Sequence, residues 1–509
     1  MPRLVTTARV PRGQVDELLT PRDGLVVEER AADGSFVAVD GPVRHYRRTV
    51  ELAEPGADGA NDGDVEVTQT VTYRLVFPFL AWMFALPYRK ALGHLGAPSR
   101  HPWWAPPDPI DPRAAAMLGA LCALAAVAAY PGVLIGQTIE FAREELGFSA
   151  SSQSFALAAV RSDFLVALAV VFVADRRGRR VVTLGAIGAG CALNAVSALA
   201  PNLEVLVGLQ ILGRGCLTGA ALLIGILAAE EMPAGCRAYA VSLLTVVGAL
   251  GAGAALLALP LADLGGGRGW RLLFVLALLG LPLVALVGRH LPESRRFRTP
   301  HREVRMRGHG RRLWLLGISA LLFGLFLAPA SQYQTVFLRR ERGFSAARIS
   351  LFAIGTNVWG GIGIVAGGRL ADVRGRRVVA AVGIVGGVGC TVAMFFSAGW
   401  TIWAWSVVGS IVGAVTVPAL GVYGPELFPT SLRGRANGII SGLGRVGSVL
   451  GLVVIAVLVR DDQPLAPIIA LLAIGPALLA VLVLVAYPET AHRELEDLNP
   501  EDAAPLPSA

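Results

Sequence analysis

Charged residues are scarce in this chain of 509 residues: 16% are Asp, Glu, Lys or Arg, whereas 54% are hydrophobic. This composition excludes an ordinary soluble enzyme, in which about a quarter of the residues are charged. Lysine is almost absent, so the net charge of +8 comes from arginine. The arginines cluster in short loops between apolar runs, which indicates membrane orientation rather than a nucleic-acid partner.

Motifs of metal, redox and catalytic chemistry are also missing. No P-loop of the GxxxxGK[ST] type occurs, so an ion gradient or the substrate's own gradient would supply any energy. No nucleophile–base pair or metal-spaced histidine set indicates an enzyme, and we expect no catalytic residue, metal or cofactor. The first seventy residues hold no long apolar run, so we expect no cleavable signal peptide. The cysteines are scattered packing residues without a Cys-x-x-Cys pair: Cys122, Cys191, Cys216, Cys236 and Cys390.

Residues 1–113 differ from the rest of the chain. We expect residues 1–22 to be disordered and the following residues to form three or four antiparallel strands, with a disordered tail as the alternative. The segment from Phe77 to Leu95 predicts an amphipathic helix at the membrane interface. Six prolines between Pro98 and Pro112 indicate a stiff linker. The expected strands run from Gly24 to Arg30, Ser35 to Val39, Val43 to Leu52 and Val65 to Phe77.

Twelve apolar runs follow, each near the roughly 20 residues that a membrane-spanning helix needs. We expect helices at about 114–136, 152–174, 181–200, 203–229, 237–259 and 270–291, and again at 313–337, 347–371, 378–398, 401–424, 434–459 and 464–486. The predicted fold is an all-α membrane protein with two six-helix halves, 114–291 and 313–486. A basic linker, 292–312, joins the halves, a tail spans 487–509, and a small α+β region precedes them. The basic loops predict cytoplasmic termini in a bacterial plasma membrane.

A ten-residue stretch occurs twice, as Val171 to Arg180 and as Gly368 to Arg377. Both copies contain Ala-Asp-x-Arg-Gly-Arg-Arg. The glycine permits a tight reversal, and the aspartate can meet an arginine or a helix N-terminus. Val171 stands where Gly368 stands in the second copy, so we expect looser packing of the second helix. The residues that we assign to gating are Asp175, Arg176, Gly178 and Arg179 in the first copy, and Gly368, Asp372, Arg374, Gly375 and Arg376 in the second.

A second motif, Glu-x-x-Pro-x-x-x-Arg, also occurs twice, from Glu230 to Arg237 and from Glu426 to Arg433. We assign these two acid–arginine pairs to the same cytoplasmic gate, with solvated helix ends as the alternative. Each half then closes on a related ending, Pro-Glu-Ser after residue 291 and Pro-Glu-Thr after residue 487.

These repeated motifs resemble those of the major facilitator superfamily, and the endings resemble its sugar-porter and metabolite–proton symporter branch. The resemblance spans residue 114 to about 497 and implies secondary transport by alternating access. The acid that proton-coupled sugar porters carry in the first helix is missing around Tyr130 and Pro131. The seventh helix has Gln332, Tyr333 and Gln334 in place of the usual sugar-binding pattern. The fifth lacks the Gly-Pro signature of drug antiporters. A sugar substrate and multidrug efflux are therefore both disfavoured.

Four charged residues are expected at membrane depth, where charges are costly and usually functional. Asp163 lies 12 residues before Asp175, about 18 Å into the bilayer at 1.5 Å per residue. Arg445 lies equally far beyond Arg433. We expect Asp163 to carry a proton, held ionised by Arg161 or Arg214, and Arg445 to bind an anionic substrate group. The alternative is structural pairing of Asp163 with Arg161 or Arg214.

The sequence thus predicts proton-coupled transport of a small organic solute, such as an anionic metabolite, by a monomer in the lipid bilayer. Nucleic acid is not expected as a partner. The alternatives are efflux of drugs or secondary metabolites, and a membrane sensor or scaffold that signals through residues 1–113. Besides Arg445, the candidate substrate-binding residues are Tyr130, Gln137, Tyr333, Gln334, Asn357 and Trp359.

Overall fold

The computed structural model describes residues 2–53, 64–76, 81–95, 102, 104–148, 152, 156, 159–263, 268–294, 306–344, 346–458 and 464–503. The chain divides into two compact units, Met1–Ala123 and Leu124–Ala509. One helix, α3 (Pro112–Leu146), passes from the first unit into the second.

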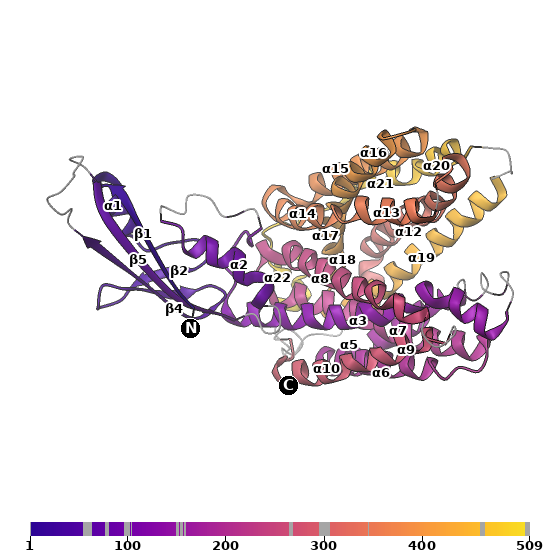
Figure 1. Cartoon of the computed structure of the whole chain (residues 1–509), viewed down its shortest axis with the longest axis horizontal. Coiled ribbons are helices and arrows are strands. Elements are labelled where there is room, and N and C mark those ends of the chain that lie inside the picture. The colour runs from indigo at the N-terminus through magenta and orange to yellow at the C-terminus, as the bar shows by residue number, and fades with distance from the viewer. Residues whose placement is uncertain are drawn as a thin grey trace. The chain divides into compact units, whose positions relative to one another are not determined.

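The first unit contains a five-stranded antiparallel sheet in the order β1-β5-β4-β3-β2 (Figure 1). The strands are β1 (Arg3–Pro11), β2 (Val27–Arg30), β3 (Phe36–Asp40), β4 (Val43–Ala53) and β5 (Asp64–Leu75), and the helices are α1 (Arg12–Leu18) and α2 (Ala81–Leu92). The prediction of a disordered segment at 1–22 is wrong, because β1 and α1 occupy it, and the sheet has one strand more than expected. The inward side of β1 is only weakly apolar, and the strand forms through pairing with β5 along its whole length.

A buried ion pair lies inside this unit. Arg48 Nη2 and Glu28 Oε2 are 2.6 Å apart, and both side chains are inaccessible to solvent. The Tyr46 hydroxyl donates to Glu28, and burial together with this carboxylate raises the pKa of Tyr46. The helix expected at the membrane interface turns Tyr88 inward against Trp104, while Leu86 is exposed. Burying charge is costly unless every partner is present, so the network of Arg48, Glu28 and Tyr46 favours one arrangement of the strands.

The second unit is helical. In its first half the helices after α3 are α5 (Asp163–Arg177), α6 (Arg179–Ser197), α7 (Leu203–Glu231), α8 (Arg237–Ala258), α9 (Trp270–Leu276) and α10 (Gly280–His290). The second half contains α12 (Gly310–Val336), α13 (Ala346–Asn357), α14 (Gly360–Arg374), α15 (Arg376–Phe396), α16 (Thr401–Ala414), α17 (Thr416–Gly421), α18 (Tyr423–Glu426), α19 (Arg433–Leu458), α20 (Leu465–Leu472) and α21 (Ile474–Ala486). Two short helices, α22 (Leu495–Leu498) and α23 (Pro500–Ala503), follow.

Among the described residues, eleven helices are long and apolar enough to cross a membrane. They match the expected spans except the second, 152–174, most of whose first seven residues lie outside the described part; α5 covers the rest. Residues 295–305 of the expected basic linker also lie outside it. The chain is thus a mostly helical, multi-pass membrane protein.

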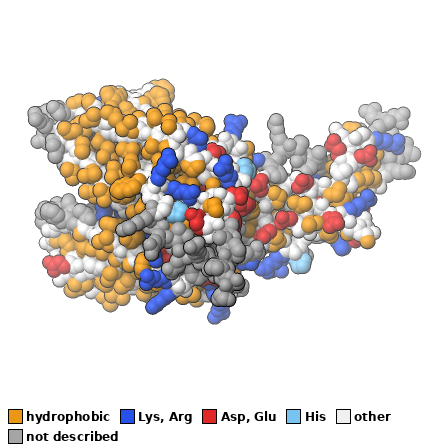
Figure 2. Space-filling view, turned by 180° about the vertical axis from the view of Figure 1, so that it is seen from behind, with side chains coloured by type: hydrophobic (Ala, Val, Ile, Leu, Met, Phe, Trp, Pro, Cys, Tyr) orange, Lys and Arg blue, Asp and Glu red, His pale blue; other side chains and the backbone are white. Residues whose placement is uncertain are grey.

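Helices of the two halves form separate groups in the second unit (Figure 1). Each group has its own apolar core, around Trp270 and Phe274 in the first half and around Phe337 and Phe352 in the second. On the face shown in Figure 2, hydrophobic side chains cover most of the helical unit, and charged side chains gather at one end. This distribution suits a body surrounded by lipid.

Candidate functional site: an ionic seam between two helical halves

The aspartate of each repeated motif caps a helix of the opposite half. Asp175, near the end of α5, accepts a 3.2 Å hydrogen bond from the backbone N–H of Arg435 in α19. Asp372, near the end of α14, accepts a 3.0 Å bond from the backbone N–H of Tyr239 in α8. A carboxylate satisfies orphan N–H groups and favours the positive end of the helix dipole. The two caps are reciprocal, so the halves present equivalent surfaces to each other.

The two motif glutamates lie at the centre of this seam. Glu230 pairs with Arg179 of its own half and with Arg433 of the other half. The same arrangement is repeated around the second glutamate, which pairs with Arg376 and Arg237. The exposed fraction of each of these side chains is at most 1%.

Buried charges such as these require all their partners, because an isolated one costs several kcal/mol. The alternative of solvated helix ends therefore does not describe this conformation. Each cluster ties the two halves together at the loop ends of the motifs.

The Pro-Glu-Ser and Pro-Glu-Thr endings support the clusters from the side. Glu293 accepts a hydrogen bond of 3.1 Å from the backbone N–H of Arg180, and Glu489 accepts one of 3.0 Å from that of Arg376. Ser294 donates to Glu230 at 2.8 Å. The endings thus act as N-terminal caps for α6 and α15. The sequence marks them as repeated motifs but does not reveal this role.

Val171 makes a close contact with the other half. A Cβ on Gly434 of α19 would lie 2.5 Å from Val171, so the two helices already touch closely. In the second copy the small residue is on the other side of the contact: a Cβ on Gly368 would lie 2.8 Å from the carbonyl oxygen of Ala238. At these two positions the glycine is supplied by opposite partners, α19 in the first copy and α14 in the second. The loop glycines Gly178 and Gly375 have φ of 102° and 96°, which favours glycine.

Two predicted gating arginines lie outside the buried clusters. Arg176 stacks on Phe172 at 4.4 Å, and Arg435 of the other half lies over the same ring at 4.5 Å. Arg374 is exposed. The first therefore adds a cation–π contact to the seam, whereas the second faces solvent.

The chain's final described residues cover the same clusters. Asp502 accepts a 3.0 Å hydrogen bond from the backbone N–H of Thr430 and lies 3.6 Å from Arg433. Asn499, which is fully buried, donates to the backbone carbonyl of Glu426 at 2.7 Å. The tail was expected only as a polar extension, and no motif in the sequence indicated this docking.

A third ionic cluster lies deeper among the helices. The Asp163 side chain is completely buried, and its carboxylate pairs with Arg445 of the second half. Arg214 Nε lies 3.7 Å from it, and the Thr218 hydroxyl donates to it at 3.2 Å. Among the described contacts Arg161 contributes its backbone carbonyl, which accepts from Arg445 at 3.2 Å. Arg445, which we expected to bind the substrate, therefore pairs with Asp163 in this conformation.

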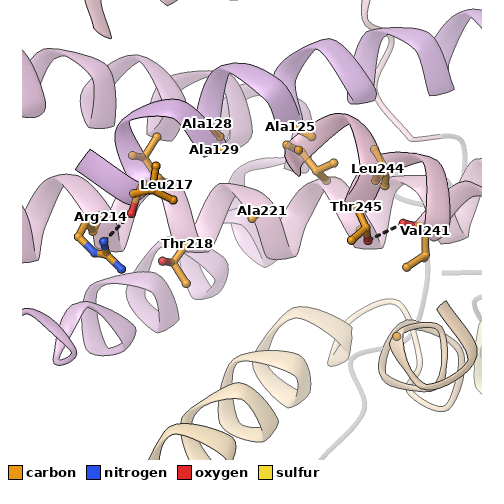
Figure 3. A pocket seen from close by; sticks show the side chains of 16 residues that line it. Ala125, Ala128, Ala129, Arg214, Leu217, Thr218, Ala221, Val241, Leu244 and Thr245 are labelled. Atoms are coloured by element: carbon orange, nitrogen blue, oxygen red, sulfur yellow. Dashed lines mark hydrogen bonds between the residues drawn. The ribbon is translucent and has the colours of Figure 1, made fainter. Parts of the chain in front are cut away.

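A cavity of about 440 Å³ adjoins this cluster, lined mostly by the first half and also by Gly421 of the second. Figure 3 shows Arg214, Thr218 and Thr245 among small and aliphatic side chains of α3, α7 and α8. Arg214 donates to the carbonyl of Gly132 on the cavity wall. Thr245 donates to the carbonyl of Val241. An apolar space with one arginine and two hydroxyls suits a small ligand that has an anionic end. Thr218 and Thr245 were missed in the sequence because isolated threonines in apolar helices carry no distinctive signal.

The other predicted ligand residues lie elsewhere. Tyr130 donates to the carbonyl of Leu273 and packs in the apolar core, and Gln137 and Trp359 are exposed. Gln334 and Asn357 line a second cavity of about 350 Å³ inside the second half. Tyr333 packs against that half's apolar core.

Comparison with known proteins agrees with this architecture. Residues 336–507 match the family model of the Major Facilitator Superfamily. A cis,cis-muconate transport protein of Acinetobacter baylyi is 24% identical over 203 residues, which are 36% of this chain and about half (48%) of that protein.

Solved structures show the same fold at low identity. The proton:xylose symporter bound to 6-bromo-6-deoxy-D-glucose is 17% identical with a TM-score of 0.65, over 75% of this chain and 98% of that one. The fucose:proton symporter of E. coli is 14% identical with a TM-score of 0.58, over 72% and 97%. The human organic anion transporter is 16% identical with a TM-score of 0.57, over 72% and 97%.

The fold and the seam define a multi-pass membrane protein whose two helical halves meet at reciprocal ion clusters. Within it, residues 336–507 match the family model of the Major Facilitator Superfamily, and the helical unit has the fold of the solved transporters named above.

Proposed function

We propose that this chain is a secondary active transporter that moves a small organic carboxylate together with protons by alternating access. The observation that carries the proposal is the buried carboxylate of Asp163, held by arginines from both halves beside an apolar cavity. Charges at membrane depth persist where they pair or bind a transported ion.

Protonation of Asp163 would release both arginines. The neutral carboxyl group no longer offsets Arg445, so the link between the halves weakens. Arg214, which lines the cavity, then becomes available to a carboxylate of the substrate. The proton leaves Asp163 on the other side of the membrane after the halves have tilted, and the two arginines recover their internal anion.

Charge conservation favours this exchange. Two arginines and one ionised aspartate carry a net charge of +1. Two arginines, a protonated aspartate and one substrate carboxylate also carry +1. The buried charge is therefore unchanged when substrate and proton bind together, which avoids the desolvation penalty of an additional ion. A neutral sugar would leave the arginines without an anion.

The similar proteins support the same class of function. The partial relative is named for transport of cis,cis-muconate, and solved structures with this fold include proton symporters and an organic anion transporter. We further propose that the protein is a monomer in the plasma membrane. Both termini would lie in the cytoplasm, because the basic loops follow the second and eighth spans. In that orientation the paired motifs form the cytoplasmic gate.

Uptake into proteoliposomes tests the proposal. Purified protein would be supplied with cis,cis-muconate, a smaller monocarboxylate or xylose, with and without an inward proton gradient. We expect gradient-driven accumulation of a carboxylate, loss of that accumulation in Asp163→Asn, and retained exchange of external for internal carboxylate.

The matched control is Glu204→Gln, which removes an exposed carboxylate at the start of α7. Gradient-driven accumulation in Asp163→Asn equal to that of the control would overturn the assignment of the proton to Asp163. Transport of xylose but of no carboxylate would overturn the substrate class.

A further inference from the structure

The sheet of the first unit has one covered face and one open face. Val67, Gln69, Val71 and Tyr73 of β5 point inward and are buried. On that side the backbone at the end of α2 accepts hydrogen bonds from Thr6 and Gln69. The alternate residues of β5 point outward, and the proposed transport cycle gives this outward face no role.

Basic residues gather at one end of the open face. Thr72 of β5 lies directly between Arg3 of β1 and Arg47 of β4 in the strand register. Arg74 lies two residues further along β5, opposite His45. Neighbouring strands are about 4.8 Å apart and alternate residues share a face, so the three arginines lie within about 10 Å of one another. All four basic side chains are exposed.

Acidic residues offset this group only in part. Asp33 lies 3.6 Å from Arg47, but both side chains are more than half exposed, so the pair is screened and weak. Glu29 of β2 lies on the same face in the row of Arg47, two strands away on the side opposite Arg3. Glu66 and Glu51 lie at the other end of the face: Glu66 faces Arg9 and Glu51 faces Thr68. We define the basic end as Arg3, His45, Arg47 and Arg74.

We propose that the basic end binds the anionic headgroups of phospholipids. Charge complementarity favours an anion, and each arginine offers several donors to phosphate oxygens. The same chain contains the candidate membrane span Pro112–Ile139, which tethers it to a lipid bilayer. A flat surface of threonines between arginines suits an extended layer of headgroups. The Phe, Tyr and Trp rings on which bases stack in single-stranded nucleic-acid sites are absent from the described open-face positions of β1, β4 and β5, where His45 is the aromatic side chain.

Chemical modification of arginine in the full-length protein tests this inference. The protein would be placed in lipid nanodiscs of phosphatidylcholine alone or with phosphatidylglycerol, treated with phenylglyoxal, and analysed residue by residue by mass spectrometry. Arg9 is an internal control, because it lies on the same face at the end that carries Glu66. With phosphatidylglycerol we expect modification of Arg3, Arg47 and Arg74 to slow about fivefold relative to that of Arg9. This is about the factor in binding that one basic residue contributes near an anionic lipid surface.

Two further conditions keep the result specific. Salt at about 0.5 M should remove the protection, since the Debye length then falls to about 4 Å. The variant R3Q/R47Q/R74Q should remove the effect of phosphatidylglycerol on hydrogen exchange in β1 and β4, whereas R9Q should retain it. Equal modification rates in both lipids would overturn the inference. Protection only after addition of RNA would overturn it in favour of nucleic acid.

Discussion

Single residues in the seam have an energetic role that can be measured separately from transport. Glu230 is fully buried and shared by Arg179 and Arg433, which come from different halves. Removing one arginine leaves a buried charge that is only partly compensated. Removing an acid and an arginine together leaves less charge unpaired.

We therefore predict a non-additive effect at this pair. Arg433→Gln should destabilise the protein by about 3 kcal/mol, and Glu230→Gln/Arg433→Gln by less than the two single changes combined. Chemical denaturation in detergent micelles would measure these values. Arg374→Gln is the control, since that motif arginine is exposed. Additive losses at Glu230 and Arg433 would show that they act independently and contradict this account of the seam.

The surroundings of Glu145, at the other end of the first half, predict that the stability of the protein depends on pH. Burial raises the pKa of its carboxyl, but hydrogen bonds from Arg271 and Trp270 outweigh burial and lower the pKa below its usual value. A carboxyl with a lowered folded-state pKa stabilises the protein above its unfolded pKa, about 4.3. That stability is lost as the pH falls through the folded-state pKa.

The melting temperature of Glu145→Gln should accordingly be lower than that of the unchanged protein at pH 7. The difference should shrink as the pH falls below about 4, because both proteins then carry a neutral side chain. Glu204→Gln, at an exposed position, controls for loss of a carboxylate. A difference that stays constant from pH 7 to pH 3 would exclude this ionic contribution.

At the scale of elements, the contacts α5–α19 and α14–α8 place a glycine on opposite partners: Gly434 of α19 lies against Val171, and Gly368 of α14 lies against Ala238. A methyl group on Gly434 would meet Val171 at 2.5 Å and the Asp175 carboxylate at 2.6 Å. The same substitution would therefore disturb both the helix contact and the cap on α19.

Gly434→Ala should destabilise the protein by about 1–3 kcal/mol, because overpacking forces the helices apart. Val171→Gly/Gly434→Ala should recover part of the loss, since the double variant has the glycine on the same side as the second contact. Gly185→Ala is a suitable control because nothing lies within 4 Å of its added methyl group. Thermal unfolding measures all three variants. No recovery in the double variant would argue against direct contact.

The positions of the helices were the feature of the fold that the sequence predicted best. Long apolar runs and repeated loops predicted the spans that the eleven candidate helices occupy, because hydrophobic length and basic turns are local properties. The strand β1 was missed because its weak alternation depends on pairing with β5, which is distant in sequence. The docking of Asp502 was missed for the same reason: nothing local distinguishes that aspartate from its neighbours.

The site was only partly accessible from sequence. Depth estimates along single helices placed Asp163 and Arg445 at similar levels, and the structure brings these two together. Which arginine faces which acid depends on how the halves dock, and sequence spacing within one helix does not contain that information. The same limit applies to Tyr130, whose hydroxyl bonds to Leu273 instead of facing a cavity.

At the scale of the whole molecule, the described conformation links the halves in two places. The reciprocal clusters at the loop ends hold one side together, and the Asp163–Arg445 pair holds the middle. In the proposed cycle, protonation of Asp163 weakens the middle link and permits the halves to tilt. The loop-end clusters must then separate in the other conformation.

Distances between spin labels at Arg177 and Arg374 test this claim most directly. Both positions are exposed at the loop ends of different halves, so labels there report separation of the halves without entering the ion clusters. In lipid nanodiscs with a transported carboxylate, the account predicts a longer distance population that grows as the pH falls. It also predicts that Asp163→Asn shows this population at every pH. A distance distribution that changes neither with pH nor with this substitution would contradict the proposed cycle.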